Sequence, residues 1–74
     1  MSLMSETRKQ RFERLGTKRV NRILNDLRLL GNLSNRSSYD YTENEIRKIF
    51  NAVDHSTKNA KSKFTFVKRV KFKL

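Results

Sequence analysis

Apolar residues recur at helical spacing in two separate segments of this chain, and this periodicity limits the fold more than any other feature. In the first segment the apolar side chains fall within one third of a helix circumference; they are Phe12, Val20, Ile23, Leu24, Leu27 and Leu30. In the second segment they are Ile46, Ile49, Phe50 and Val53. The pattern predicts an all-α fold made of two amphipathic helices.

Short capping motifs predict where both helices begin. Thr7 and Gln10 fit a capping box, which predicts a first helix over about 6–30, and Gly31 is expected to end it in the left-handed conformation. Thr42 and Glu45 fit a second capping box, which predicts a helix over about 43–62. The eleven residues of 31–41 are rich in turn formers, so we expect a structural loop there, with a recognition loop as the alternative.

The chain of 74 residues is long enough for one small domain only. We predict a two-helix hairpin over residues 6–63, preceded by a disordered N-terminus or expression scar at 1–5 and followed by a separate tail at 64–74. Two apolar stripes alone make a thin core, whereas two hairpins packed as an antiparallel four-helix bundle bury both stripes. The sequence therefore predicts a symmetric homodimer.

The tail predicted at 64–74 carries a second, conflicting period. From Lys63 onward, aromatic and aliphatic residues alternate with polar ones as in a strand, although Phe64 and Val67 also continue the helical stripe. A lone strand has no partner within this chain. The tail is therefore expected to be strand-like and paired with another copy, to extend the helix, or to be mobile until bound.

Eighteen Lys and Arg against seven Asp and Glu give the chain a net charge of +11, and this charge falls in blocks. Residues 1–31 carry +5, residues 32–57 carry −1 and residues 58–74 carry +7. Six cations are expected opposite the apolar stripe of the first helix: Arg8, Arg11, Arg14, Lys18, Arg19 and Arg22. Five more lie at the C-terminal end: Lys63, Lys68, Arg69, Lys71 and Lys73.

A row of positive charges without interspersed negative ones along one face of a helix is complementary to the negative charge of a phosphate backbone. Three aromatic side chains, Phe64, Phe66 and Phe72, lie among the tail cations, where they could stack on bases, pack on the hairpin or enter a membrane interface. The leading prediction is a small non-enzymatic accessory protein that binds RNA or DNA through phosphate contacts with weak sequence specificity. The alternative is an assembly module whose partner is an acidic protein.

Several classes of function are not expected from this composition. The chain has no Cys and one His, so no cofactor or metal site is predicted, and no catalytic constellation or small-molecule substrate site is evident. No stretch approaches the ~20 apolar residues of a membrane span, and residues 1–10 lack the apolar core of a signal peptide. We therefore expect a cytoplasmic protein without a membrane partner.

One segment around the predicted loop resembles a family of small bacterial proteins. The run from Leu27 to Arg36 contains Gly-Asn-Leu-Ser-Asn-Arg and is followed by Tyr39-Asp40-Tyr41-Thr42. Members of the family share that segment and a Tyr-x-Tyr-Thr or Tyr-x-Tyr-Ser cap. The resemblance covers roughly residues 8–64 and implies no activity, cofactor or binding residue; the basic tail lies outside it.

Overall fold

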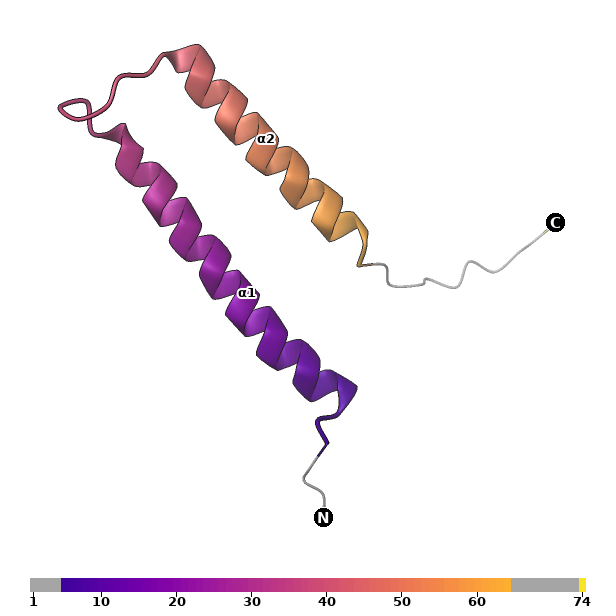
Figure 1. The fold of residues 1–74 in the computed structure, drawn as a ribbon. Coiled ribbons are helices and arrows are strands. Elements are labelled where there is room, and N and C mark those ends of the chain that lie inside the picture. The colour runs from indigo at the N-terminus through magenta and orange to yellow at the C-terminus, as the bar shows by residue number, and fades with distance from the viewer. Residues whose placement is uncertain (1–4, 65–73) are drawn as a thin grey trace. The chain divides into compact units, whose positions relative to one another are not determined.

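The structure, a computed structural model, describes residues 5–64 and residue 74 (Figure 1). Helix α1 spans Arg8–Gly31, helix α2 spans Glu43–Ser62, and the short 3-10 helix η1 lies between them at Asn32–Ser34. No strand occurs in this described part, so the predicted all-α class with two helices is confirmed. The chain divides into two compact units, 1–40 and 41–74.

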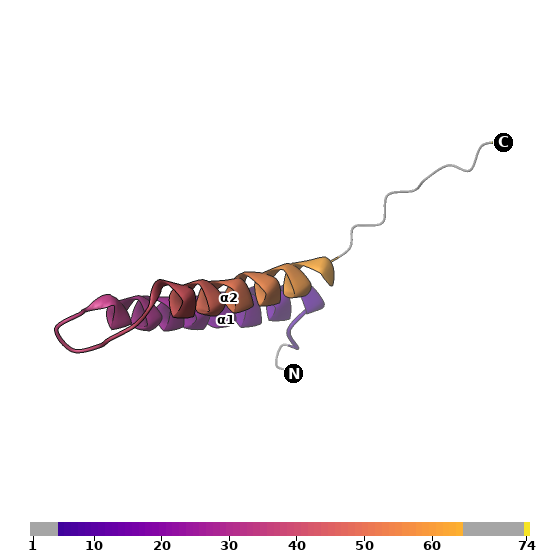
Figure 2. The same ribbon diagram turned by 90° about the horizontal axis from the view of Figure 1, so that it is seen from above.

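Helix α1 begins at the capping box that the sequence predicts. The Thr7 hydroxyl accepts a hydrogen bond from the backbone N–H of Gln10 at 3.0 Å, and the Gln10 side chain accepts one from the Thr7 N–H at 2.9 Å. Two N–H groups that have no partner within a helix are thereby satisfied. Figures 1 and 2 show α1 as a single helix without a break.

The end of α1 differs from the expectation at Gly31. This residue has φ −62° and ψ −27°, which is right-handed, and no described residue has a positive φ. The predicted left-handed termination is therefore wrong. Instead the chain tightens into η1, and the N–H of Asn32 donates to the carbonyls of Arg28, Leu29 and Leu30. A 3-10 turn satisfies the last carbonyls of a helix without left-handed backbone, which is why glycine's freedom is not used here.

The loop after η1 is ordered by Asn35. Its side-chain oxygen accepts hydrogen bonds from the backbone N–H and the hydroxyl of Ser37, at 3.1 and 2.7 Å. Its carbonyl oxygen accepts from the N–H groups of Ser38 and Tyr39, at 3.1 and 3.0 Å. The turn-forming residues thus build the structural loop that their composition predicts.

Helix α2 starts at the second predicted capping box. Thr42 and Glu45 exchange hydrogen bonds of 3.1 and 2.8 Å in the same reciprocal pattern. Further along the helix, the Thr57 hydroxyl donates to the Val53 carbonyl one turn earlier, at 2.9 Å. The helix ends at Ser62, and the N–H of the C-cap residue Lys63 donates to the carbonyls of Ala60 and Lys61.

None of the described residues is buried. Among the apolar residues that a four-helix bundle would bury, Ile23 is 57% exposed, Phe50 42% and Leu27 38% in this structure of one copy. The predicted homodimer and four-helix bundle remain predictions, since both require a second copy. Within the described residues, neither helix combines the length and apolarity needed to cross a membrane.

Candidate nucleic-acid interface

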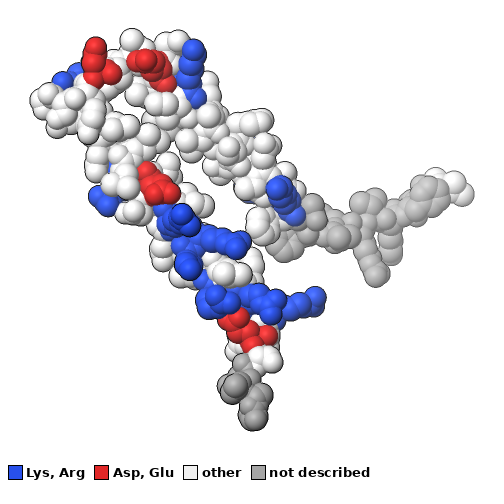
Figure 3. Space-filling view, in the orientation of Figure 1, with Lys and Arg blue, Asp and Glu red and all other residues white. Residues whose placement is uncertain are grey.

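The six cations predicted on the first helix all lie in α1, between its first residue and Arg22. Arg8 and Arg22 are fourteen positions apart in the helix, which is about 21 Å along the axis. Figure 3 shows Lys and Arg side chains gathered over this N-terminal part of α1. The helix therefore carries its cations as one extended group and not as scattered single charges.

The face that lies opposite the apolar stripe is narrower than the sequence analysis predicts. At about 100° per residue, Arg11, Arg14, Lys18 and Arg22 lie on the far side of the helix from that stripe. We call these four residues the outer cationic face. Arg8 and Arg19 lie roughly 80–100° from the centre of the stripe, at its edge, so their predicted position opposite the stripe is corrected.

Arg14 holds an acidic partner within the same unit. Its guanidinium donates to both carboxylate oxygens of Glu6, from Nε at 2.6 Å and from Nη2 at 2.9 Å. The pair spans eight residues, because Glu6 lies just before the Thr7 cap and its side chain reaches over the first turns of α1. A bidentate pair of this kind fixes the orientation of the guanidinium.

This pair changes the acidity of both groups. The hydrogen bond from Arg14 lowers the pKa of Glu6 below its ordinary value of 4.5, and the positive charges of Arg14 and Arg11 act in the same direction. The hydrogen bond to Glu6 raises the pKa of Arg14 further above its already high ordinary value. Glu6 is thus a carboxylate at neutral pH and neutralises one of the four charges on the outer cationic face.

The remaining cations of that face form no ion pair among residues 5–64, although the charge of Arg11 acts on Glu6 at longer range. Arg11, Lys18 and Arg22 are exposed, and no ion pair joins any of them to a described carboxylate. By contrast, Lys9 lies 3.9 Å from Glu13 and 5.6 Å from the centre of the Phe12 ring. Exposed guanidinium and ammonium groups without local partners are available to an external anion.

Of the other predicted site residues, Lys63 alone falls within the described residues. Lys63 lies in the second unit, at the C-terminal end of α2, where a cation interacts favourably with the helix dipole. The predicted binding residues Lys68, Arg69, Lys71 and Lys73 lie outside the described residues. The described candidate site therefore consists of the α1 cations alone.

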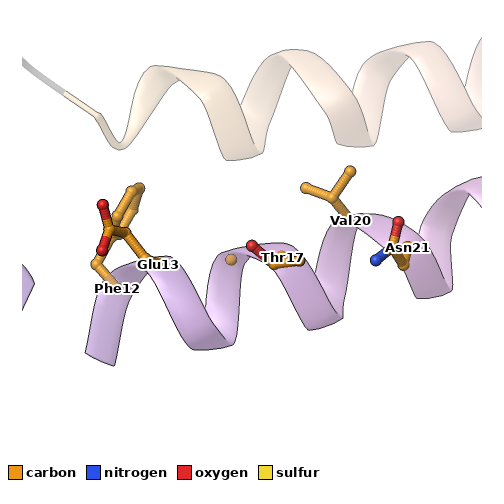
Figure 4. A pocket seen from close by; sticks show the side chains of 6 residues that line it. Phe12, Glu13, Thr17, Val20 and Asn21 are labelled. Atoms are coloured by element: carbon orange, nitrogen blue, oxygen red, sulfur yellow. The ribbon is translucent and has the colours of Figure 1, made fainter. Parts of the chain in front are cut away.

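Sequence patterns did not reveal two features of α1. The Glu6–Arg14 pair escaped notice because ion pairs on a helix are usually sought three or four residues apart, and Glu6 precedes the helix. The second feature is a surface hollow beside Gly16, between Phe12 and Val20 (Figure 4). A small residue between two large ones on the same face was the available signal for it.

Comparisons with known proteins add no further constraint on this site. The resemblance of residues 8–64 to the small bacterial family remains a prediction based on its motif. None of the family profiles, curated proteins or solved structures matches the chain.

Proposed function

We propose that this protein is a small non-enzymatic accessory protein that binds RNA or DNA through phosphate contacts. The observation that supports the proposal most directly is the outer cationic face, on which Arg11, Lys18 and Arg22 form no ion pair within the described chain. Like charges on one helix repel one another, so an arrangement without local neutralisation is favoured when an anion screens it.

The dimensions of the face suit a phosphate backbone. Duplex DNA carries about one charge per 1.7 Å of axis, so the roughly 16 Å between Arg11 and Arg22 lie beside about 10 phosphates. Long Lys and Arg side chains adjust to phosphates without base contacts, and such contacts carry no direct sequence information. We therefore expect weak sequence specificity and strong salt dependence.

The test is a salt titration of oligonucleotide affinity for the full chain and two variants of equal charge. The first variant combines Arg11→Gln, Lys18→Gln and Arg22→Gln; the control combines Lys48→Gln, Lys58→Gln and Lys61→Gln on α2. Gln is a good helix former, so both variants should keep their helix content. On duplex DNA, the plot of log K against log salt has a negative slope. The loss of three phosphate contacts should make this slope less negative by roughly 2.7, whereas the control variant should change it by less than about 1.

Equal losses in both variants would contradict the proposal, because net charge alone would then explain the binding. Crosslinking in cells separates the proposal from the alternative of an acidic protein partner. Recovered nucleic acid that is lost in the first variant supports the proposal. Recovery of an acidic protein without nucleic acid supports the assembly module instead.

A further inference from the structure

The apolar stripe of α1 contains a series of positions whose spacing along the chain is the same when counted from either end. The series is Phe12, Gly16, Val20, Ile23, Leu27 and Gly31, and its intervals are four, four, three, four and four residues. All six positions lie within about 50° of one line along the helix. We call this series the α1 seam. Its midpoint falls between Asn21 and Arg22.

A symmetric spacing lets the seam pair with itself when two copies of α1 run antiparallel. Positions equally far from the midpoint then face each other: Phe12 faces Gly31, Gly16 faces Leu27, and Val20 faces Ile23. Each glycine lies opposite a large apolar side chain, and the two β-branched residues lie opposite each other. Alternation of large and small residues across an interface allows two helices to interdigitate.

The structure supplies the recess that this pairing requires. A hollow of about 450 Å³ lies over Gly16, and its lining includes Glu13, Gly16, Thr17 and Val20. These four positions have the spacing of the hole that receives one side chain from a facing helix in knobs-into-holes packing. Within the first unit the space is open: a Cβ added at Gly16 meets no atom within 4 Å, and Val20 is 53% exposed.

The charges beside the seam favour the same pairing. The helix surface on either side of the seam forms its two margins. In an antiparallel pair related by a two-fold axis, each margin of one copy faces the same margin of the other copy. Arg19 and Asp26 share one margin, and Glu13 and Arg28 lie on the other. In the proposed register Arg19 comes within about two residues, or 3 Å along the axis, of Asp26 in the second copy, and Glu13 comes equally close to Arg28.

These contacts would use both acidic residues of α1, which are Glu13 and Asp26. Asp26 has no ion pair in the described part of the chain, and Glu13 has only the 3.9 Å contact with Lys9. A parallel pair in register would instead place each seam residue beside its own copy, so that Gly16 faces Gly16 and Leu27 faces Leu27. The matching of large residues with glycines along the seam therefore selects a second copy in the antiparallel orientation, and the charges at its margins are compatible with it.

We infer that the α1 seam is a homodimer interface in which two α1 helices pack antiparallel, with Leu27 of each chain seated over Gly16 of the other. The outer cationic faces then lie on the outside of the pair, away from the contact. This inference adds an orientation and a register to the dimer that the sequence predicts. It is independent of the nucleic-acid proposal, because its tests contain no nucleic acid.

The first test measures the mass of the full chain by light scattering as a function of concentration. Wild type should be a dimer, and Gly16→Leu should weaken dimerisation by about tenfold or more, because two leucines then meet at each hole. Leu is a better helix former than Gly, so helix content at low concentration should not fall in this variant. Adding Leu27→Ala to Gly16→Leu should restore dimerisation, since the large and small partners are exchanged.

The second test exchanges charges. Arg19→Glu or Asp26→Arg alone places like charges together and should weaken the dimer, whereas the double variant should recover it. Arg22→Glu makes the same charge change as Arg19→Glu on the outer cationic face and should leave the dimer unchanged. A monomeric wild type at tens of micromolar, or an unaffected Gly16→Leu dimer, would overturn the inference.

Orientation is tested with engineered cysteines, since the chain has none of its own. Val20→Cys mixed with Ile23→Cys should form a mixed disulfide between chains. Leu27→Cys alone should not crosslink, because the two Leu27 positions are then about 16 Å apart along the axis. A Leu27→Cys homodisulfide with no mixed Val20–Ile23 product would show a parallel pair and overturn the proposed register.

Discussion

Thr7 and Thr42 each exchange two hydrogen bonds with the residue three positions later, and both exchanges could be predicted from the sequence. A capping box involves only neighbouring residues, so its signal is complete within four positions. The Glu6–Arg14 pair is different in kind. It depends on the path of the chain before the helix, and no spacing rule for helices covers a contact over eight residues.

The same pair makes a prediction about acidity. In Arg14→Gln, the pKa of Glu6 should rise toward 4.5, because its largest cause of lowering is the hydrogen bond from Arg14. NMR titration of the Glu6 carboxyl measures this directly, with Arg22→Gln as the control that leaves it unchanged. A Glu6 pKa that stays low in Arg14→Gln would assign the effect to Arg11.

The direction of the pH effect follows from the lowered pKa. A carboxyl whose pKa is lower in the folded than in the unfolded chain stabilises the fold fully above pH 4.5, and this contribution is lost as the pH falls through the lowered pKa. Wild type should therefore lose helix content at the start of α1 below pH 4.5. Arg14→Gln should lack this transition.

At the scale of single elements, the first and last residues of both helices were predictable within about two positions. The capping motifs and the apolar periodicity independently indicate the same two segments. The end of α1 was not. A glycine after an apolar stripe is a common left-handed terminator, but the following Asn-Leu-Ser turn satisfies the α1 carbonyls through η1. The choice between the two endings depends on residues beyond the glycine.

This difference is testable by Gly31→Ala. A left-handed glycine would resist the substitution, whereas Gly31 has right-handed angles and open space around its Cβ position. We expect Gly31→Ala to stabilise α1 by about 0.4–1 kcal/mol, mainly by restricting the unfolded chain. Helix content by circular dichroism, at a concentration low enough to limit association, provides the measurement. A loss of helix content would contradict the right-handed ending.

At the scale of the whole molecule, the described chain has two amphipathic helices and no buried side chain. Periodicity identified which residues are apolar and on which face they lie, but it carries no information about what covers them. The net charge of +11 likewise predicts an anionic partner without identifying it. Partner identity depends on a second molecule, and for this reason the candidate site was only partly predictable.

A chain that completes its core by association should melt at a temperature that depends on its concentration. By mass action, a higher protein concentration favours the associated state over the unfolded chains. The melting temperature should therefore increase by roughly 5 °C per tenfold increase in concentration. Circular dichroism melts over a hundredfold range of concentration test this. A sharp transition at a constant temperature would show that a single chain folds without a second copy.

The absence of buried side chains among residues 5–64 also bears on how long a chain survives in a cell. Proteases cleave backbone that opens readily, and a helix held by caps and local hydrogen bonds alone opens far more often than one anchored in a core. Newly made chains without a partner should therefore be degraded quickly, while bound chains persist. The cellular level of this protein would then follow the supply of its partners more closely than its own rate of synthesis.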